Sequence, residues 1–299
     1  MTHTTMGPSP RHSRILVGGL AAATALLSLA CGERKPDIFL KSGDQYTTKV
    51  DFARLEHEKP LTRGDLLKLT PALLESLSQE EVDQVYARLT AGPIPDGAYE
   101  GTFFFSKGGG LERITEQLGG LKGQAVGFKL QLLELVGQKI WKGKVFYRNE
   151  RLLRNMIDKR PSVDVFLKSQ QVDTGQLRQI KTGGIDAYLL FPARLYCGQS
   201  LLDGRRESII IDYAFTDEIE GYQEGIDRLG GRSGTQIRDE IRMVRPGFYL
   251  GRAYLSRSFA LNFTLLNKDV EGKARDAFVR DGRIEEDCRI GGQLQAALR

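Results

Sequence analysis

Histidine is scarce in this sequence, and its shortage excludes the commonest catalytic centres. The 299 residues contain three histidines, and His3 and His12 precede an apolar stretch at the N-terminus. His57 is therefore the only histidine in the rest of the chain, and it lies among charged residues with no nucleophile motif beside it. Ser–His–Asp and Cys–His centres are accordingly unsupported.

Cysteine and glycine are equally uninformative about cofactors. The three cysteines are isolated from one another, which does not fit the clustered ligands of a zinc site. The glycine runs lack the pattern of a phosphate loop or a dinucleotide fingerprint.

Acidic and basic residues, 38 and 43 in number, are interspersed along the chain, so no basic surface for nucleic acid is predicted. We expect no metal, cofactor or nucleic-acid partner, and the sequence identifies no protein partner.

The N-terminus has the composition of a bacterial export signal. Arg11 and Arg14 give a basic start, and residues 15–30 (ILVGGLAAATALLSLA) contain no charged side chain. This stretch is shorter than the ~20 apolar residues that span a bilayer, but it fits the apolar core of a signal peptide. We predict a signal peptide over residues 1–30.

Cys31 ends this stretch, and two processing sites compete there. Residues 27–31 (LSLAC) resemble a bacterial lipobox, with Ser28 at the position where leucine is usual. Lipidation of Cys31 would anchor the protein to a membrane. Alternatively, Ser28-x-Ala30 is a small-x-small site for ordinary signal peptidase. Either site predicts export to the cell envelope, facing the periplasm or the outer surface.

The segments that follow are expected to be a tether and a helical hairpin. Residues 31–60 are charged and weakly periodic, which is typical of a tether. Within residues 61–96, Thr70-Pro71 and the capping box at 78–81 predict helix starts.

From Gly97 the apolar periodicity changes to two, which predicts β-strands. In the segment 141–147, Lys142 and Lys144 are expected on the face opposite Trp141. The absence of regular βα alternation favours an α+β fold with an antiparallel sheet that curls or closes over 97–268. A tail at 269–299 follows. The predicted strands are at 97–105, 141–147, 185–197, 207–215, 237–245, 248–255 and 258–266, and the predicted helices are at 111–118, 125–136 and 273–279.

Several of these segments resemble a group of bacterial lipocalin-like proteins. Residues 97–101 (GAYEG) are similar to a Gly-x-Trp-x-Gly opening strand, and 141–146 (WKGKVF) to a later Trp-x-Gly-Lys-x-Phe segment. Residues 211–213 (IDY) and 239–244 (DEIRMV) are similar to a Tyr-Asp strand and an Asp-x-Phe-Arg-x-Val segment. The resemblance implies a calycin-like β-barrel whose interior holds an apolar or lipid-like molecule, and it implies no catalytic mechanism.

Two interpretations apply to the polar residues of these strands. Asp212, Asp239 and Arg242 form either a polar anchor at a pocket mouth or ion pairs that fix strand register. Residues 245–252 are either a ligand-facing strand or a glycine-containing barrel corner. The candidate ligand-binding residues are Tyr99, Trp141, Tyr147, Asp212, Tyr213, Asp239, Arg242, Tyr249 and Arg252.

Cys197 and Cys288 are either paired, as an oxidising compartment permits, or two buried thiols. The leading functional hypothesis is a membrane-anchored envelope lipoprotein that binds or hands over an apolar small molecule. One alternative is a structural or assembly protein that docks a partner through the hairpin or tail. Another is a carboxylate-dependent lipid-modifying enzyme, which requires two of Asp212, Asp239 and Glu240 to meet in one cavity.

Overall fold

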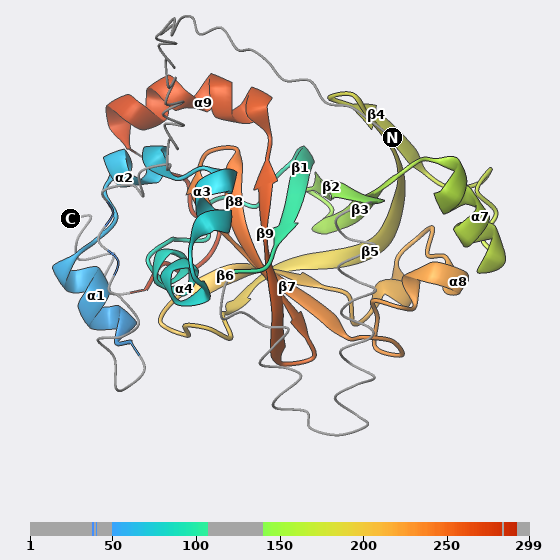
Figure 1. The fold of residues 1–299 in the computed structure, drawn as a ribbon, viewed down its shortest axis with the longest axis horizontal. Coiled ribbons are helices and arrows are strands. Elements are labelled where there is room, and N and C mark those ends of the chain that lie inside the picture. Colours follow the sequence, from blue (N-terminus) through green and yellow to red (C-terminus); the bar gives the residue numbers. More distant parts are fainter. Residues whose placement is uncertain (1–37, 39, 41–49, 107–139, 283, 292–299) are drawn as a thin grey trace, which may run out of the picture. The chain divides into compact units, whose positions relative to one another are not determined.

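Eight antiparallel strands close into a barrel (Figure 1). Neighbouring strands follow one another along the chain, and β9 pairs back with β1 to complete the ring. A further strand, β4 (Gln179–Thr182), pairs with β5 outside the ring. The ring consists of β1 (Gly97–Phe104), β2 (Trp141–Tyr147), β3 (Leu152–Asp158), β5 (Ile185–Gln199), β6 (Glu207–Asp212), β7 (Ile237–Arg245), β8 (Phe248–Leu255) and β9 (Ser258–Leu266).

This computed structural model describes residues 38, 40, 50–106, 140–282 and 284–291. All of them belong to one unit, Lys35–Arg299. The predicted signal peptide, Cys31 and the predicted helices at 111–118 and 125–136 lie outside the described residues.

The α+β class and the barrel are confirmed. The predicted strands at 237–245, 248–255 and 258–266 coincide with β7, β8 and β9. β3 is not predicted from the sequence, because Asn155 occupies an inward position between Leu153 and Ile157 and interrupts the apolar alternation.

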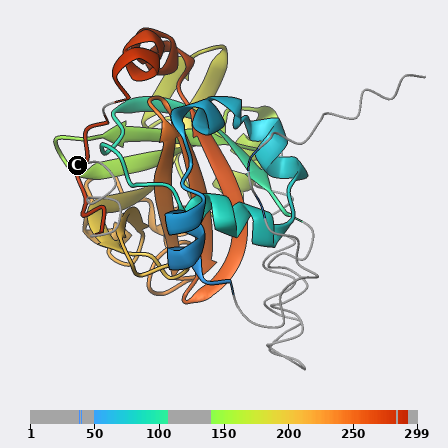
Figure 2. The same ribbon diagram turned by 90° about the vertical axis from the view of Figure 1, so that its left-hand side faces the viewer.

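Four short helices cover the outside of the barrel on one side (Figure 2). They are α1 (Phe52–Glu58), α2 (Arg63–Lys68), α3 (Pro71–Ser76) and α4 (Gln79–Ala87). Thr70 and Ser78 cap α3 and α4, and a capping box joins Ser78 to Glu81. The apolar faces of these helices pack on outward side chains of the barrel, among them Val244, Phe248 and Leu250. Helix α1 falls within the segment predicted as a tether.

The remaining helices lie elsewhere around the barrel. α7 (Pro161–Ser169) and α8 (Glu224–Asp227) lie beside each other at the right of Figure 1, and η2 (Thr216–Glu218) is a single short turn. α9 (Lys268–Asp281) follows β9 and contains the predicted helix at 273–279. None of the described helices combines the length and hydrophobicity needed to cross a membrane.

A β-bulge in β2 reverses one predicted side-chain direction. Trp141 pairs with Ile157 but Gly143 pairs with Met156, so one residue is added to β2 relative to β3. Gly143 has a φ of 131°, and a Cβ there would lie 2.0 Å from the Tyr99 carbonyl oxygen. As a result Lys144 points into the barrel with Trp141, and the prediction that it lies on the opposite face was wrong.

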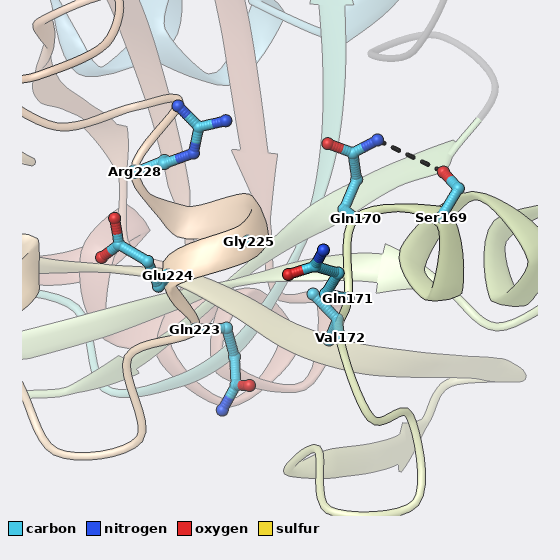
Figure 3. A pocket seen from close by; sticks show the side chains of 8 residues that line it. All are labelled: Ser169, Gln170, Gln171, Val172, Gln223, Glu224, Gly225 and Arg228. Atoms are coloured by element: carbon cyan, nitrogen blue, oxygen red, sulfur yellow. Dashed lines mark hydrogen bonds between the residues drawn. The ribbon is translucent and has the colours of Figure 1, made fainter.

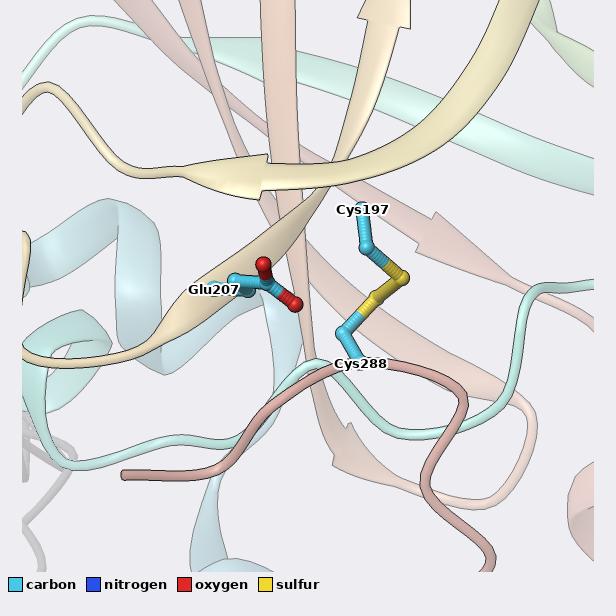
Figure 4. A group of neighbouring side chains, drawn as sticks. All are labelled: Cys197, Glu207 and Cys288. Atoms are coloured by element: carbon cyan, nitrogen blue, oxygen red, sulfur yellow. A yellow bond between two sulfur atoms is a disulfide. The ribbon is translucent and has the colours of Figure 1, made fainter. Parts of the chain in front are cut away.

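A disulfide between Cys197 and Cys288 fastens the C-terminal segment 284–291 across one end of the barrel (Figure 4). The Asp287 amide donates to the Gly92 carbonyl, and the Arg289 amide donates to the Glu207 carboxylate. Glu207 lies beside the disulfide, but both sulfurs are committed to the S–S bond and offer no thiolate to a metal. Of the two alternatives for these cysteines, the structure shows the disulfide-bonded pair.

Candidate functional site

An ion pair lies inside the barrel at the centre of a hydrogen-bonded group. Lys144 Nζ donates to Tyr213 Oη at 2.7 Å, to Asn155 Oδ1 at 2.9 Å and to Asp239 Oδ2 at 3.0 Å. Three of these residues lie in β2, β3 and β7, and Tyr213 directly follows β6; we call the four the polar centre. All four are buried, with at most 5% of any residue exposed. The barrel therefore encloses charge as well as apolar side chains.

Aromatic rings surround the polar centre. The Trp141 indole N–H donates to Asn155 Oδ1 at 2.9 Å, and Phe103 stacks on the indole with 4.0 Å between ring centroids. Lys144 Nζ lies 5.4–5.6 Å from the ring centroids of Trp141, Tyr213 and Phe263, within the range of cation–π attraction. The ammonium is therefore stabilised by ring faces as well as by oxygen acceptors.

Two glycines make room for these rings. A Cβ on Gly101 would lie 2.0 Å from the Trp141 ring, and a Cβ on Gly251 would lie 2.2 Å from the Phe263 ring. Each ring consequently lies against the backbone of a neighbouring strand. The aromatic surroundings of the polar centre depend on these two positions.

The protonation states leave the polar centre without an activated nucleophile. Burial lowers the pKa of Lys144, but the contacts with Tyr213 and Asp239 outweigh burial and raise it. Burial raises the pKa of Tyr213 to about 12. Burial also raises the pKa of Asp239, while Lys144 opposes that shift. At neutral pH Lys144 is an ammonium and Tyr213 a neutral phenol, so neither group is a ready nucleophile.

Half-buried apolar side chains lie at the end of the barrel where β1 and β8 end and where β2 and β7 begin. We call this set the apolar rim. On β7, Asp239 is the next inward-pointing residue after the rim residue Ile237. Its partner on the neighbouring strand β8 is the small residue Ala253. The opposite end is closed by segment 284–291 and by Tyr249, whose hydroxyl donates to the Pro93 carbonyl at 2.6 Å. The rim residues are Phe103, Phe105, Ile140, Ile237 and Leu255.

The structure divides the predicted ligand-binding residues into two groups. The inward group lies in the barrel core or the polar centre, whereas the outward group lies on the outer wall. The inward residues are Tyr99, Trp141, Tyr213, Asp239 and Tyr249, and the outward ones are Tyr147, Asp212, Arg242 and Arg252.

Arg242 and Arg252 attach helix α4 to the outside of the barrel. Arg242 donates to the Tyr86 carbonyl at 3.1 Å and to Ser208 Oγ at 2.9 Å, and it is fully buried. Arg252 pairs with Asp83 and donates to the Tyr254 hydroxyl. These two arginines therefore have a structural role between two layers, and the predicted anchor of Asp212, Asp239 and Arg242 does not form.

The three carboxylates of the enzyme hypothesis also lie apart. Asp239 is inside the barrel, whereas the adjacent Glu240 points outward to Arg238 and the Leu201 amide. Asp212 accepts a hydrogen bond from the Tyr196 hydroxyl on the outer wall, at 2.8 Å. Among the described residues, no two of these carboxylates share a cavity.

Two residues of the polar centre, Lys144 and Asn155, are not predicted from the sequence. The alternation predicts Lys144 on the face opposite Trp141, because the bulge at Gly143 cannot be seen in the apolar pattern. Asn155 carried no signal, since a lone asparagine between apolar residues is typical of a loop or a strand end.

A polar hollow of about 410 Å³ lies on the surface between the end of α7 and α8 (Figure 3). Half of its lining residues are exposed, and Gln170 Nε2 donates to Ser169 Oγ at 3.2 Å. It contains none of the predicted site residues. The lining residues are Ser169, Gln170, Gln171, Val172, Gln223, Glu224, Gly225 and Arg228.

Asp227 fastens α8 to a bend in β5, and its titration predicts a pH dependence of stability. Its carboxylate accepts from the Phe191 amide at 2.6 Å and the Gln223 amide at 2.8 Å. Burial raises its pKa from 3.8 to about 6. The folded state therefore binds this proton more tightly than the unfolded state. The contribution to stability is complete below pH 4 and is lost as the pH rises to about 6, by up to about 3 kcal/mol.

Denaturant unfolding between pH 4 and 7 checks this expectation against Asp227→Asn. The side-chain amide of this variant has a single acceptor oxygen, so it accepts only one of the two hydrogen bonds. The resulting loss of stability is the same at every pH. The difference between the two proteins should nevertheless change across pH 4–6 and level off above it. A constant difference at every pH would show that Asp227 has an ordinary pKa.

The fold and the site define an α+β protein with a closed, up-and-down, calycin-like barrel and a charged group in its interior. No family model matches the chain, and no curated protein matches it. A crystal structure of a protein from Thermomonospora curvata aligns with 69% of this chain and 97% of its own, at 16% identity and a TM-score of 0.37. An overlap this loose says nothing about the activity of either protein.

Proposed function

We propose that this protein is an exported lipoprotein, anchored to a cell-envelope membrane through Cys31, whose barrel binds or hands over a small apolar molecule. The observation that carries the proposal is the polar centre inside the barrel, beneath the apolar rim. A buried ion pair usually stabilises a core less than well-packed apolar residues of similar volume. A barrel selected for stability alone would place aliphatic side chains at Lys144 and Asp239, and a binding site gives a reason to keep the pair.

The rim supplies the apolar part of such a site. Phe103, Phe105 and Leu255 are half-buried side chains that a ligand can cover further, which removes apolar surface from water. Anchoring at Cys31 would hold this barrel close to a membrane, where apolar molecules are concentrated.

The assembly alternative has less support. The helices of the predicted hairpin already bury Leu74, Val82 and Val85 against the barrel. The tail is fastened through Cys288. The hairpin surface named by that hypothesis is therefore largely occupied within this chain, and segment 284–291 of the tail is held by the disulfide.

Native mass spectrometry tests ligand binding directly. The full-length chain, released gently from its membrane, should carry a small molecule that is lost on unfolding. The double change Lys144→Met with Asp239→Val, which leaves no buried charge unpaired, should reduce its occupancy, whereas Tyr147→Phe, on the outer wall, should not. Recovery of only the empty protein under every mild condition would contradict the proposal.

The same spectra test the anchor. Both processing sites leave Cys31 as the first residue, but only the lipobox adds a diacylglycerol to it. An N-terminal peptide of unmodified mass would remove the anchor from the proposal and leave export intact.

A further inference from the structure

Asp239 uses only one of its carboxylate oxygens within the polar centre. Oδ2 accepts from Lys144 Nζ at 3.0 Å and from Tyr213 Oη at 3.4 Å. Among the described residues, Oδ1 accepts no hydrogen bond, although the side chain is only 6% exposed. Oδ1 is not among the buried side-chain oxygens that lack a partner, so it keeps contact with solvent through this small exposed fraction. Oδ1 therefore marks a position that a donor from outside the described residues can fill.

The hydrogen-bond donors of the centre are, by contrast, already used. An ammonium has three N–H groups, and those of Lys144 are directed at Tyr213, Asn155 and Asp239. The Asn155 amide donates to the Phe191 carbonyl and to Tyr213 Oη, each at 3.0 Å. The Trp141 N–H is bonded to Asn155. An anionic ligand would find no unused donor here and would be repelled by Asp239.

The position of Asp239 makes Oδ1 accessible to a molecule held at the rim. One inward step along β7 separates Asp239 from Ile237, and the same step along β8 separates Ala253 from Leu255. Inward positions of a strand repeat at about 7 Å. A ligand that covers the rim can therefore contact the Asp239 carboxylate through a polar group. That group needs to be only a few atoms away from the apolar part of the ligand.

We infer that the molecule bound in the barrel carries a hydrogen-bond donor, a hydroxyl or an ammonium, which Asp239 Oδ1 accepts while the apolar part lies against the rim. This inference rests on the proposed function and adds the chemistry of the ligand. An amphiphile with a donor head is bound in preference to a carboxylate of the same chain length.

The single tryptophan of the chain provides the measurement, because Trp141 lies within the proposed site. The protein is the full-length Cys31→Ser chain, which carries no lipid, studied without detergent. Octanol, octylammonium and octanoate are titrated at neutral pH and followed by Trp141 fluorescence. We expect octanol or octylammonium to bind about tenfold more tightly than octanoate, the effect of one hydrogen bond to a charged group. Comparison of the first two then shows whether the donor is neutral or cationic.

A double variant tests whether Asp239 is the cause. Lys144→Met together with Asp239→Val removes both charges and leaves no unpaired ion, so it avoids the fold loss that either single change risks. It should bind the three probes with similar affinity, whereas Gln223→Ala in the α7–α8 hollow should keep the wild-type preference.

The outcomes separate the inference from the proposed function. Octanoate binding as tightly as octanol, or an unchanged preference in the double variant, would overturn the inference and leave ligand binding in place. No response of Trp141 to any probe, with the protein recovered empty, would refute both.

Discussion

Lys144→Met should lower the free energy of unfolding by about 3–5 kcal/mol, because it leaves the Asp239 carboxylate buried without its partner. Tyr213 and Asn155 also lose the donor that they share. Denaturant unfolding followed by Trp141 fluorescence measures this change beside the affected site. The double change Lys144→Met and Asp239→Val should recover most of the stability, since no charge then remains unpaired.

Lys142 offers a matched control two residues away. It pairs with Asp158 at 3.6 Å, and its side chain is 32% exposed against 3% for Lys144. Lys142→Met should cost less than about 1 kcal/mol, as exposed ion pairs do. Equal effects of the two substitutions would contradict the burial of Lys144.

Removal of the disulfide should have the second large effect. Cys197→Ser with Cys288→Ser should destabilise the protein by about 2–5 kcal/mol, because the bond closes a long loop and restricts the unfolded chain. The two cysteines are 91 residues apart in sequence. Segment 284–291 should also gain freedom, since Cys288 is part of the barrel core.

Thermal unfolding with and without a thiol reductant measures this effect. Reductant should lower the melting temperature of the wild-type chain toward that of the double serine variant and leave the variant unchanged. Hydrogen exchange at the Asp287 and Arg289 amides, which bond Gly92 and Glu207, should become faster in the variant. A variant as stable as the oxidised wild type would show that the hydrogen bonds alone hold the segment.

The elements that the sequence predicted well are those with local causes. Thr70 and Ser78 cap their helices through hydrogen bonds to residues three positions away, so a short motif is sufficient. The strands at 237–245, 248–255 and 258–266 are bounded by turn residues and alternate clearly on their inward faces.

The site was only partly predictable for a physical reason. Aromatic residues at inward positions, such as Tyr99 and Tyr213, followed from periodicity. Arg242 did not, because its outward position is covered by α4, and a strand pattern contains no information about what packs on its outer face.

By itself, the sequence determined the local features: helix starts, strand alternation, the α+β class and the scarcity of catalytic residue types. Only the tertiary structure decided that β9 closes on β1, that Cys197 meets Cys288, and that the bulge at Gly143 turns Lys144 toward Asp239. Each of these depends on strand register between distant segments. A shift of one residue moves every side chain of a strand to the other face, so the polar centre exists only once the barrel has closed.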